Sequence, residues 1–501
     1  MTVADQATTA TTAAPSVVHI SIDSSKDRVP ISLYIYGANQ HAKHAADHPL
    51  TRIGGNRWTA YSWENNASNA GSDWHHQNDD FLSKSNEPGE AVRVNLEAAA
   101  KNHQAIIVTV PTCGYVSADK GPEGDVNQTP DYLNKRFHKT IAKKNGPLQL
   151  KPDLNDAFVY QDEFVNWVEH TKSPAEVVFY SLDNEPDIWS ATHARIHPEK
   201  LTYAEIVQKT IEYAGAIKDV KADAMIFAPA NYGWNGYRTL QNAPDANGRD
   251  FHQVYLAEMK KAEANAGKRL LDVLDVHWYP EATGDGVRVT GKENTPGVVA
   301  ARVQAPRSLW DPTYVETSWI TKDNTHGEPI NMLTRLKKDV EQFYSGTKIA
   351  VTEYNYGGGD HISGAIAQAD VLGIFGREGI FAACLWPESE NTEFIDAAFE
   401  IYLKHFGDTS VSAKTDDAAA TSVYASVDSR DPSRMSIVLI NKTAHTITAD
   451  LNIAGDAKFT KCATFQLTDV AATPKSLGER TFGDRRCELP AFSVTMLELS
   501  R

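Results

Sequence analysis

Eight short apolar segments, separated by stretches with helical periodicity, constrain the fold of this chain more than any other feature. They lie between residues 31 and 406, and their near-continuous apolar character is typical of strands buried on both faces of a parallel sheet. The predicted strands are residues 34–38, 51–54, 105–110, 177–182, 224–228, 273–278, 348–353 and 379–385. Eight strands that alternate with helices predict a closed (β/α)8 barrel, the TIM-like arrangement.

Two of the predicted helices carry clear end signals. Thr202 stands three residues before Glu205, which is the spacing of a capping box at a helix start. Gly267 follows the apolar-periodic stretch 255–266 and suits the position after a helix end. An open doubly wound α/β sheet is the alternative architecture, but the sequence lacks the glycine-rich first turn of that fold.

The pattern changes after residue 406. Apolar and polar side chains alternate between turn-rich segments, which is typical of an antiparallel β-sandwich, at residues 422–427, 436–441, 446–453, 459–467 and 492–499. Val18, Ile20 and Ile22 alternate in the same way. We therefore divide the chain into a low-complexity N-terminal arm at 1–16, a strand at 17–30 that joins the sandwich, a TIM-like catalytic barrel at 31–406 and a C-terminal β-sandwich at 407–501.

The charge and the apolar runs argue against two classes of partner. The chain has 65 acidic and 49 basic residues and a formal net charge of −16, which opposes binding to a nucleic-acid backbone. The sequence has no apolar run long enough to span a bilayer, so we expect no membrane partner. The Thr- and Ala-rich start of the chain has neither the basic region nor the apolar core of a secretory signal.

All ten tryptophans lie in the predicted barrel, between Trp58 and Trp386, and the predicted sandwich has none. Most of them follow a predicted strand, on the face where barrels place their active sites. An indole face stacks on a flat sugar ring, while neighbouring Asn and Asp side chains bind the hydroxyl groups. The cluster favours a carbohydrate site, and the alternative for any single tryptophan is a place in the barrel core.

Two glutamates follow directly after predicted strands. Glu185 lies in Asp-Asn-Glu-Pro at 183–186, after the fourth strand, and Glu353 ends the seventh. A carboxylate is costly there unless it has a partner or a role in chemistry. Barrel strands four and seven lie across the mouth from each other, and glycoside hydrolysis needs two carboxyl groups on opposite sides of the scissile bond. A buried salt bridge is the alternative for either glutamate taken alone.

Four segments together resemble glycoside hydrolase family 44, a family of clan A. They are Arg-Ile-Gly-Gly-Asn-Arg at 52–57, Tyr-Ser-Trp-Glu-Asn-Asn at 61–66, Leu-Asp-Asn-Glu-Pro at 182–186 and Asp-Val-His-Trp-Tyr-Pro at 275–280. The resemblance covers most of the chain and implies a TIM-like barrel with a β-sandwich. It also implies a retaining endo-β-1,4-glucanase, a cellulase-type glycosidase that cuts internal bonds of cellulosic glucans, with xyloglucan or xylan as further substrates.

The resemblance assigns roles to individual residues. Glu185 would be the general acid/base and Glu353 the nucleophile, with their carboxyl groups about 5–5.5 Å apart. Asn184 would bind the sugar 2-hydroxyl, and Trp386 would form the floor of the subsite next to the cleavage point. The other substrate-binding candidates are Asn56, Trp63, His277, Tyr279 and Trp319. The residue that contacts the nucleophile is left open among Arg52, Asn56 and Arg57.

The chemistry implied by this family requires no cofactor, and metal ligands are left unassigned. Carboxylates are plentiful at 73–80 and 153–156, so a structural calcium is one interpretation of these loops and a solvated polar loop is the other. Alternatives to the glucanase are a clan A enzyme for xylan or mannan and a metal-dependent barrel hydrolase that uses His75, His76 and His277. A carbohydrate-binding protein without catalysis is disfavoured by the two strand-end glutamates.

The implied partner is a β-glucan polysaccharide, bound by a monomer. Because such a polymer cannot enter a cell, we expect a secreted, extracellular enzyme. The four cysteines form no CxxC pair, so a zinc knuckle is not indicated. Cys113 and Cys384 lie beside apolar runs and are expected to be buried thiols, whereas pairing of Cys462 with Cys487 is left open.

Overall fold

The computed structural model describes residues 16–454, 459–483 and 485–501, so the predicted N-terminal arm lies almost wholly outside the described residues. The chain forms two compact units. One contains residues 31–358 and 374–392, and the other contains residues 359–373, 393–501 and the described part of 1–30. The candidate site lies in the first unit.

The first unit is built on a closed barrel of eight parallel strands, in the order β11-β12-β13-β16-β17-β3-β4-β7. The strands are β3 (Gly37–Asn39), β4 (Leu50–Ile53), β7 (Ala105–Val110), β11 (Val178–Leu182), β12 (Ile226–Asn231), β13 (Val273–Trp278), β16 (Lys348–Tyr354) and β17 (Ala382–Leu385). Each predicted apolar segment overlaps one of these strands. The predicted (β/α)8 barrel is therefore confirmed.

The boundaries differ from the prediction by three residues at one end of three strands, β3, β12 and β17, the last of which begins at Ala382. Residues 34–36 belong to the 3-10 helix η1 (Leu33–Tyr36), because the Ser32 hydroxyl caps its start by accepting the Tyr34 N–H. Strand β12 runs three residues further than predicted, to Asn231. Proline lacks the N–H of a regular strand, so Pro229 indicates an earlier end in the sequence. The extension places the residues after β12 at the barrel mouth.

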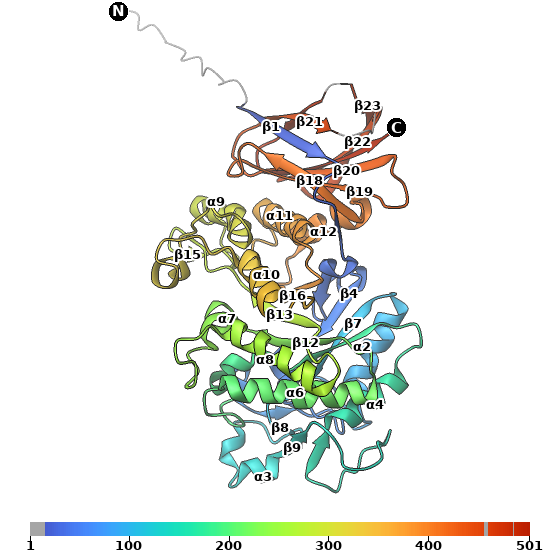
Figure 1. Ribbon diagram of the computed structural model, residues 1–501, viewed down its shortest axis with the longest axis vertical. Coiled ribbons are helices and arrows are strands. Elements are labelled where there is room, and N and C mark those ends of the chain that lie inside the picture. The colour runs from blue at the N-terminus through green and yellow to red at the C-terminus, as the bar shows by residue number, and fades with distance from the viewer. Residues whose placement is uncertain (1–15, 455–458, 484) are drawn as a thin grey trace, which may run out of the picture. The chain divides into compact units, whose positions relative to one another are not determined.

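Helices cover the outside of the barrel (Figure 1). Four of them pack each against the next along the chain: α4 (Gln161–Thr171), α6 (Tyr203–Val220), α8 (Phe251–Ala266) and α10 (Met332–Phe343). Both predicted end signals are confirmed, since the Thr202 hydroxyl accepts the Glu205 N–H and Gly267 ends α8 with φ 68°. The other helices are α1 (Asn56–Thr59), α2 (Glu90–Lys101), α3 (Tyr132–Arg136), α5 (Trp189–Thr192), α7 (Trp234–Thr239), α9 (Pro296–Gln304), α11 (Ile362–Glu378) and α12 (Glu393–His405).

The barrel interior is apolar at one end and polar at the other. Phe179, Phe227 and Val273 belong to a buried apolar cluster formed by the first part of the strands. His277 lies four residues beyond Val273, at the carboxyl end of β13, where parallel barrels place their sites. Short paired strands occur in the connections: β5 (Ser68–Asn69) with β6 (Asn78–Asp79), β9 (Phe137–Ile141) with β8 (Tyr115–Ser117) and β10 (Phe158–Tyr160), and β14 (Thr283–Gly284) with β15 (Val287–Arg288).

The second unit contains one ten-stranded sheet, in the order β23-β22-β25-β20-β19-β18-β1-β21-β24 with β2 beside β18. Cys462 on β22 and Leu489 on β24, from opposite ends of this order, share one buried core with Ile20 of β1. The sheet therefore curls round its core as a sandwich. Its strands are β1 (Ser16–Asp23), β2 (Val29–Pro30), β18 (Thr409–Thr415), β19 (Thr421–Val427), β20 (Arg434–Asn441), β21 (Ile447–Ala454), β22 (Lys461–Thr468), β23 (Ala471–Thr481), β24 (Arg486–Leu489) and β25 (Ser493–Ser500).

The cysteines and the helices bear on two further expectations. All four cysteines are free thiols in the structure, so Cys462 and Cys487 are not joined, and Cys113 and Cys384 are buried as predicted. A helix that is long and apolar enough to cross a bilayer does not occur in the part of the chain that the structure describes.

Candidate active site

Glu185 lies at the carboxyl end of β11, in a turn with an unusual backbone conformation. Asp183 and Glu185 adopt left-handed φ values of 65° and 44°, which are uncommon for residues other than glycine. The Asp183 carboxylate holds this turn by accepting the N–H groups of Thr112 and Cys113. The Glu185 N–H donates to Ala230 O on β12 at 3.0 Å. Backbone strain of this kind clusters at functional sites.

Glu353 lies at the end of β16, and its carboxylate is close to the side chains of Arg52, Tyr279 and His277. Arg52 Nη1 donates to Oε1 at 2.7 Å, and the Tyr279 hydroxyl donates to Oε2 at 2.9 Å. His277 Nδ1 lies 3.4 Å from Oε2. The fully buried Arg52 guanidinium also donates to Asn184 Oδ1 at 2.8 Å. Arg52 is therefore the residue that contacts Glu353, which the sequence left open among three candidates, and charge-assisted bonds of this kind stabilise a carboxylate anion.

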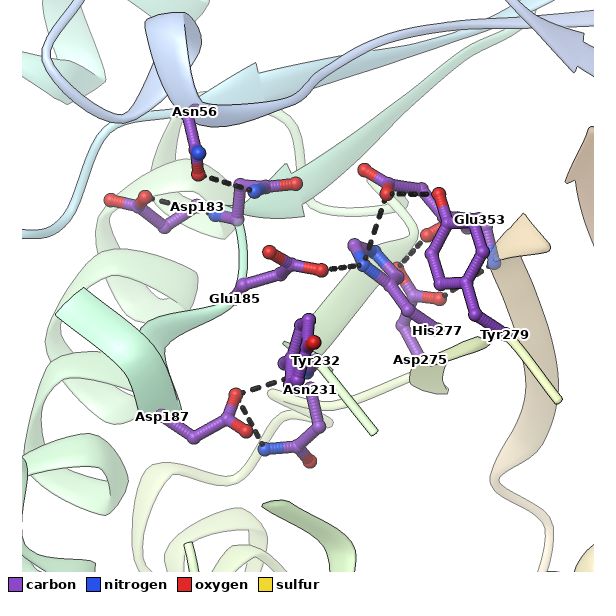
Figure 2. A network of polar contacts seen from close by, with 12 residues as sticks. Asn56, Asp183, Glu185, Asp187, Asn231, Tyr232, Asp275, His277, Tyr279 and Glu353 are labelled. Atoms are coloured by element: carbon purple, nitrogen blue, oxygen red, sulfur yellow. Dashed lines mark hydrogen bonds and ion pairs between the residues drawn. The ribbon is translucent and has the colours of Figure 1, made fainter. Parts of the chain in front are cut away.

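The carboxyl groups of the two glutamates converge at the barrel mouth (Figure 2). His277 Nδ1 lies between them, 2.9 Å from Glu185 Oε1 and 3.4 Å from Glu353 Oε2. One oxygen of each glutamate and one nitrogen of His277 all lie within 4.8 Å of one another. This spacing matches retaining glycosidases, whose carboxyl groups are about 5–5.5 Å apart, and is shorter than the roughly 6.5–9.5 Å of inverting enzymes.

Burial sets the protonation of the groups between the strands. It raises the pKa of Glu185 to about 8, although the nearby Arg52 charge acts in the opposite direction. It lowers the pKa of His277 to about 3, so the imidazole is neutral and adds no positive charge. At neutral pH Glu185 therefore carries a proton that it can donate, while Glu353 has the donors that an anion requires.

Two hollows open beside this pair, both within the barrel unit. The larger, of about 610 Å³, is lined by Glu185 and Glu353. The smaller, of about 370 Å³, is lined by Tyr232 and Trp319. Tyr279 lines both hollows, so they meet at the residue that bonds Glu353. A chain of sugar rings that passes the two carboxyl groups has a place on either side of them.

Four of the predicted substrate-binding residues line the larger hollow: Asn56, Asn184, Tyr279 and Trp386. The Asn56 amide donates to Asp73 Oδ1 at 2.8 Å, which fixes its orientation at the start of α1. Gly55 is required beneath the Trp386 ring, because a Cβ atom there would lie 2.6 Å from the indole and φ is 96°. The close approach holds the indole at the carboxyl end of β17.

The two other predicted sugar platforms differ in exposure. The Trp319 side chain is 37% exposed and lines the smaller hollow, so a face of its ring is available to a ligand. Trp63 is 1% exposed, and its ring stacks on Phe164 and packs against Trp167. The expectation that Trp63 forms a subsite platform is therefore wrong, because a ring enclosed by other rings presents no face to a sugar.

Most of the tryptophans are buried, but not all of these lie in the barrel core. Six of the ten are buried: Trp58, Trp63, Trp167, Trp189, Trp234 and Trp278. Trp63, Trp167 and Trp189 line neither hollow and fit the alternative interpretation, in which a tryptophan fills the core. Trp58 lines the larger hollow, and Trp234 and Trp278 line the smaller. Their position after strands is the same for core and ligand-facing rings, so sequence position cannot separate the two.

Several residues at the site were not found from the sequence. Tyr232, 42% exposed, follows β12 and lines the smaller hollow. Asp275 lies on β13 and accepts the Thr352 hydroxyl at 2.8 Å, and burial raises the pKa of its carboxyl to about 7. Asp187, two residues after Glu185, is buried in the same region. The position of Tyr232 directly after a strand could have indicated a role at the site. Pro229 made the predicted strand end three residues before the observed end of β12, so this position was not recognised.

The residues proposed for a metal-dependent hydrolase do not come together. Within the described residues, three side chains that could hold a metal gather only at Glu185, His277 and Glu353. Neither His75 nor His76 belongs to this group. In the loop 73–80, Asp79 pairs with Arg57 at 2.6 Å. The metal-dependent alternative therefore lacks its ligand set.

The model of glycoside hydrolase family 44 matches residues 67–282. Endoglucanase A of Paenibacillus lautus is 42% identical over 473 residues, which cover 89% of this chain and 67% of that protein. The chain belongs to glycoside hydrolase family 44. A β-mannanase/endoglucanase A of Caldicellulosiruptor saccharolyticus is 43% identical over 500 residues, and the match spans 92% of this chain but only 37% of that longer protein.

Solved structures of this family have the same fold. A family 44 xyloglucanase from Paenibacillus polymyxa aligns with a TM-score of 0.91 at 38% identity, covering 97% of this chain and all of that one. A family 44 endoglucanase from Clostridium thermocellum aligns equally well, with a TM-score of 0.91 at 39% identity and the same coverage. These two structures thus share the fold of this chain, a barrel with a curled antiparallel sheet. As a member of family 44, this protein is a glycoside hydrolase.

Proposed function

We propose that this family 44 protein is a retaining endo-β-1,4-glucanase with Glu185 as general acid/base and Glu353 as nucleophile. The observation that carries the proposal is the pair of glutamates whose oxygens approach within 4.8 Å. Burial keeps a proton on Glu185, and Arg52 and Tyr279 donate to Glu353. One acid and one anion at this spacing are what double displacement requires.

The two steps use these groups in turn. In the first, a Glu353 oxygen bonds to the anomeric carbon while the glycosidic C–O bond breaks and Glu185 gives its proton to the leaving oxygen. In the second, Glu185 takes a proton from water, whose oxygen attacks the anomeric carbon and releases Glu353 as a carboxylate. Two inversions at the same carbon retain the β configuration.

We assign the two hollows to the two sides of the scissile bond. Asn184 and Trp386 lie with both glutamates in the larger hollow, which we assign to the sugar that Glu353 attacks. The smaller hollow, beyond Tyr279, then receives the leaving-group side of the chain, where Tyr232 and Trp319 present exposed rings. Sites on both sides of the cleavage point suit an enzyme that cuts within a polymer.

The proposed substrate is a β-1,4-glucan of the cellulosic type, with xyloglucan and xylan as further substrates. Its support is the similarity to proteins named endoglucanase and xyloglucanase. The test is reducing-sugar release from carboxymethyl-cellulose, xyloglucan, xylan and mannan, with viscosity followed in parallel. A fast viscosity drop with little sugar release marks internal cleavage. If sugar is released from xylan or mannan alone, the enzyme has one of the other clan A activities and is not a glucanase. If none of the four polysaccharides is cleaved, the proposal is wrong.

Activity on unactivated substrates is expected to fall as the pH rises through about 8, because Glu185 loses its proton there. The measurement is kcat/KM for cellopentaose from about pH 5 to about pH 10. 2,4-Dinitrophenyl β-cellobioside, whose leaving group needs no proton, is the control and should not lose kcat/KM at this limb. An alkaline limb near pH 5, or the same limb for both substrates, speaks against the assignment of Glu185.

The chemistry needs no cofactor. We propose a structural calcium beside Glu64, whose binding would have to draw the neighbouring carboxylates together, since no three of them lie within 4.8 Å of one another among the described residues. This carboxyl is 3% exposed, and burial together with Asp156, Glu163 and Asp153 raises its pKa to about 8. Glu163 Oε2 is buried without a hydrogen-bond partner among the described residues. Lys144 is the nearby cation, and it already pairs with Glu163 Oε1 at 2.6 Å. Oxygen ligands with surplus negative charge suit Ca²⁺.

Calcium is accordingly expected to stabilise the protein without changing its chemistry. Adding Ca²⁺ to protein treated with a chelator should raise the Tm by several degrees, roughly the effect of a few kcal/mol of binding linkage. Glu64→Gln should abolish this rise while leaving kcat on cellopentaose unchanged below the melting range. A Tm that does not respond to Ca²⁺ in the wild type would remove the calcium proposal and leave the glucanase intact.

Location and assembly follow from the substrate and are likewise proposals. An insoluble or very long polysaccharide is met outside the cell, so the enzyme is expected to act extracellularly. Both hollows and all the groups that act on the substrate come from one chain, so a monomer is sufficient. Sedimentation of the purified protein at a mass near 55.1 kDa is the expected result for a monomer.

A further inference from the structure

Asp187 follows Glu185 by two residues and is buried beside it, yet the double displacement gives it no task. We propose that Asp187 is a positioning residue that fixes the Tyr232 ring beside Glu185, so that the ring receives the sugar of the leaving group. This inference rests on the proposed function, since it assigns the smaller hollow to that sugar.

The contacts of Asp187 lead directly to the end of β12. Its Oδ1 accepts the Tyr232 N–H at 3.1 Å and the Asn231 amide at 3.3 Å (Figure 2). Asn231 is held in turn by His252, whose Nε2 lies 2.9 Å from Asn231 Oδ1. The Glu185 N–H donates to Ala230 O at 3.0 Å. The turn after β11 and the end of β12 are thus tied at two adjacent points.

Tyr232 lies near Glu185 and lines a hollow that is open to a ligand. Its ring is 42% exposed and lines the smaller hollow together with Trp319. Burial, and next the charge of Glu185, raise the pKa of the Tyr232 phenol, which indicates that the two groups are close. Because Asp187 bonds the Tyr232 backbone, a shift of Asp187 moves the base of this ring.

A carboxyl group is an expensive anchor at this position. Asp187 is buried, which raises the pKa of its carboxyl to about 7, and its Oδ2 has no hydrogen-bond partner among the described residues. An unsatisfied buried oxygen is destabilising, so stability alone does not favour an aspartate here. The need to hold the end of β12 in place explains the aspartate, because its Oδ1 accepts hydrogen bonds from both Asn231 and Tyr232.

Gly236 on α7 shows how tightly the Asp187 carboxyl is confined. A Cβ atom at Gly236 would lie 2.2 Å from Asp187 Oδ2, so any larger residue must displace the carboxyl. Alanine is a better helix former than glycine, which makes a glycine within α7 unfavourable for the helix alone. The glycine preserves the place of Asp187 at a cost to the helix.

The first test compares Asp187→Ala with Asp187→Asn on two substrates. Asp187→Ala is expected to lower kcat/KM for cellopentaose by about tenfold to a hundredfold, because a small misplacement of a substrate-binding group is that costly. 2,4-Dinitrophenyl β-cellobioside places no sugar in the smaller hollow, so its kcat/KM should stay within about twofold. Asp187→Asn keeps the Oδ1 acceptor and should retain cellopentaose activity within about threefold.

The second test retains the Asp187 carboxyl but displaces it from its position. Gly236→Ala should reproduce the Asp187→Ala pattern, with a loss on cellopentaose and little change on the dinitrophenyl substrate. Gly215→Ala on α6 is the matched control, since nothing lies within 4 Å of a Cβ atom there. It should leave both activities unchanged. Tm values for all four variants separate loss of position from loss of folding.

The outcomes distinguish this inference from the proposed function. An equal loss on both substrates, or full cellopentaose activity in both Asp187→Ala and Gly236→Ala, overturns the positioning role. A wild-type protein that cleaves neither cellopentaose nor the dinitrophenyl substrate overturns the proposed function itself. If Asp187→Ala does not fold, Gly236→Ala alone decides the question, because its carboxyl and its helix are both retained.

Discussion

Replacing Glu353 with alanine is expected to lower kcat on cellopentaose by about 10⁴-fold or more, the scale on which loss of a covalent nucleophile acts. The change removes the atom that bonds to the anomeric carbon, and no other carboxylate stands within 4.8 Å of both Glu185 and His277 among the described residues. Steady-state hydrolysis by wild type and variant at equal concentration measures the loss. Residual activity above about 1% of wild type would argue against a nucleophilic role.

Azide identifies the face of attack. The space left by the Glu353 side chain admits a small anion, which then attacks the anomeric carbon of 2,4-dinitrophenyl β-cellobioside from the side that Glu353 used. The expected product is the α-glycosyl azide, with activity restored. Glu353→Gln is the matched control, since the amide fills the same space and should be inactive without rescue. A β-glycosyl azide from Glu353→Ala would assign Glu353 to the other role.

Replacing Glu185 with alanine is expected to lower kcat on cellopentaose by about 10²–10⁴-fold, the range of general acid catalysis. The first step with the dinitrophenyl substrate needs no proton and should remain fast. The second step loses its base, so the glycosyl-enzyme accumulates, and a burst of dinitrophenol followed by slow turnover is the expected trace. Azide should accelerate that turnover and yield the β-glycosyl azide. Absence of a burst, with both substrates equally slow, would contradict the role.

The conservative variant Glu185→Gln tests the burial that underlies this role. Burial raises the pKa of Glu185 to about 8 in the folded state, above its ordinary value, so the wild type is most stable when the group is protonated. Its contribution to the free energy of unfolding is lost as the pH rises from the ordinary value towards 8. Glutamine has no proton to lose, so the Tm advantage of Glu185→Gln should grow between about pH 5 and about pH 8.

The barrel could be predicted because its signal is repeated along the chain. Each buried strand must be apolar on both faces, so eight segments carry the same pattern, and each overlaps a strand of the closed barrel. Helix ends are also local: the Thr202 hydroxyl and the Glu205 N–H are three residues apart and bond within one turn. The prediction that residues 34–36 belong to a strand was wrong, because the Ser32 cap favours a 3-10 helix more than so short an apolar pattern favours a strand.

Glu185 and Glu353 stood out because a carboxylate directly after a buried strand is rare without a function. Their separation was implied by a resemblance and not by the sequence itself. Trp63 and Trp319 looked alike in sequence, yet one is enclosed by Phe164 and Trp167 and the other faces the smaller hollow. Which ring a ligand can reach depends on neighbours from distant segments, and strand-end position does not encode them.

The sequence by itself determined the eight-stranded barrel, the helix ends and the two strand-end glutamates, because these depend on periodicity and on contacts within a few residues. Only the tertiary structure decided that Arg52, 301 positions from Glu353, is the guanidinium that bonds it. It likewise joined Asp187 to Tyr232 and set the proton on Glu185 by burial. Closure of the barrel creates these contacts and this burial, and neither exists until the distant strands are side by side.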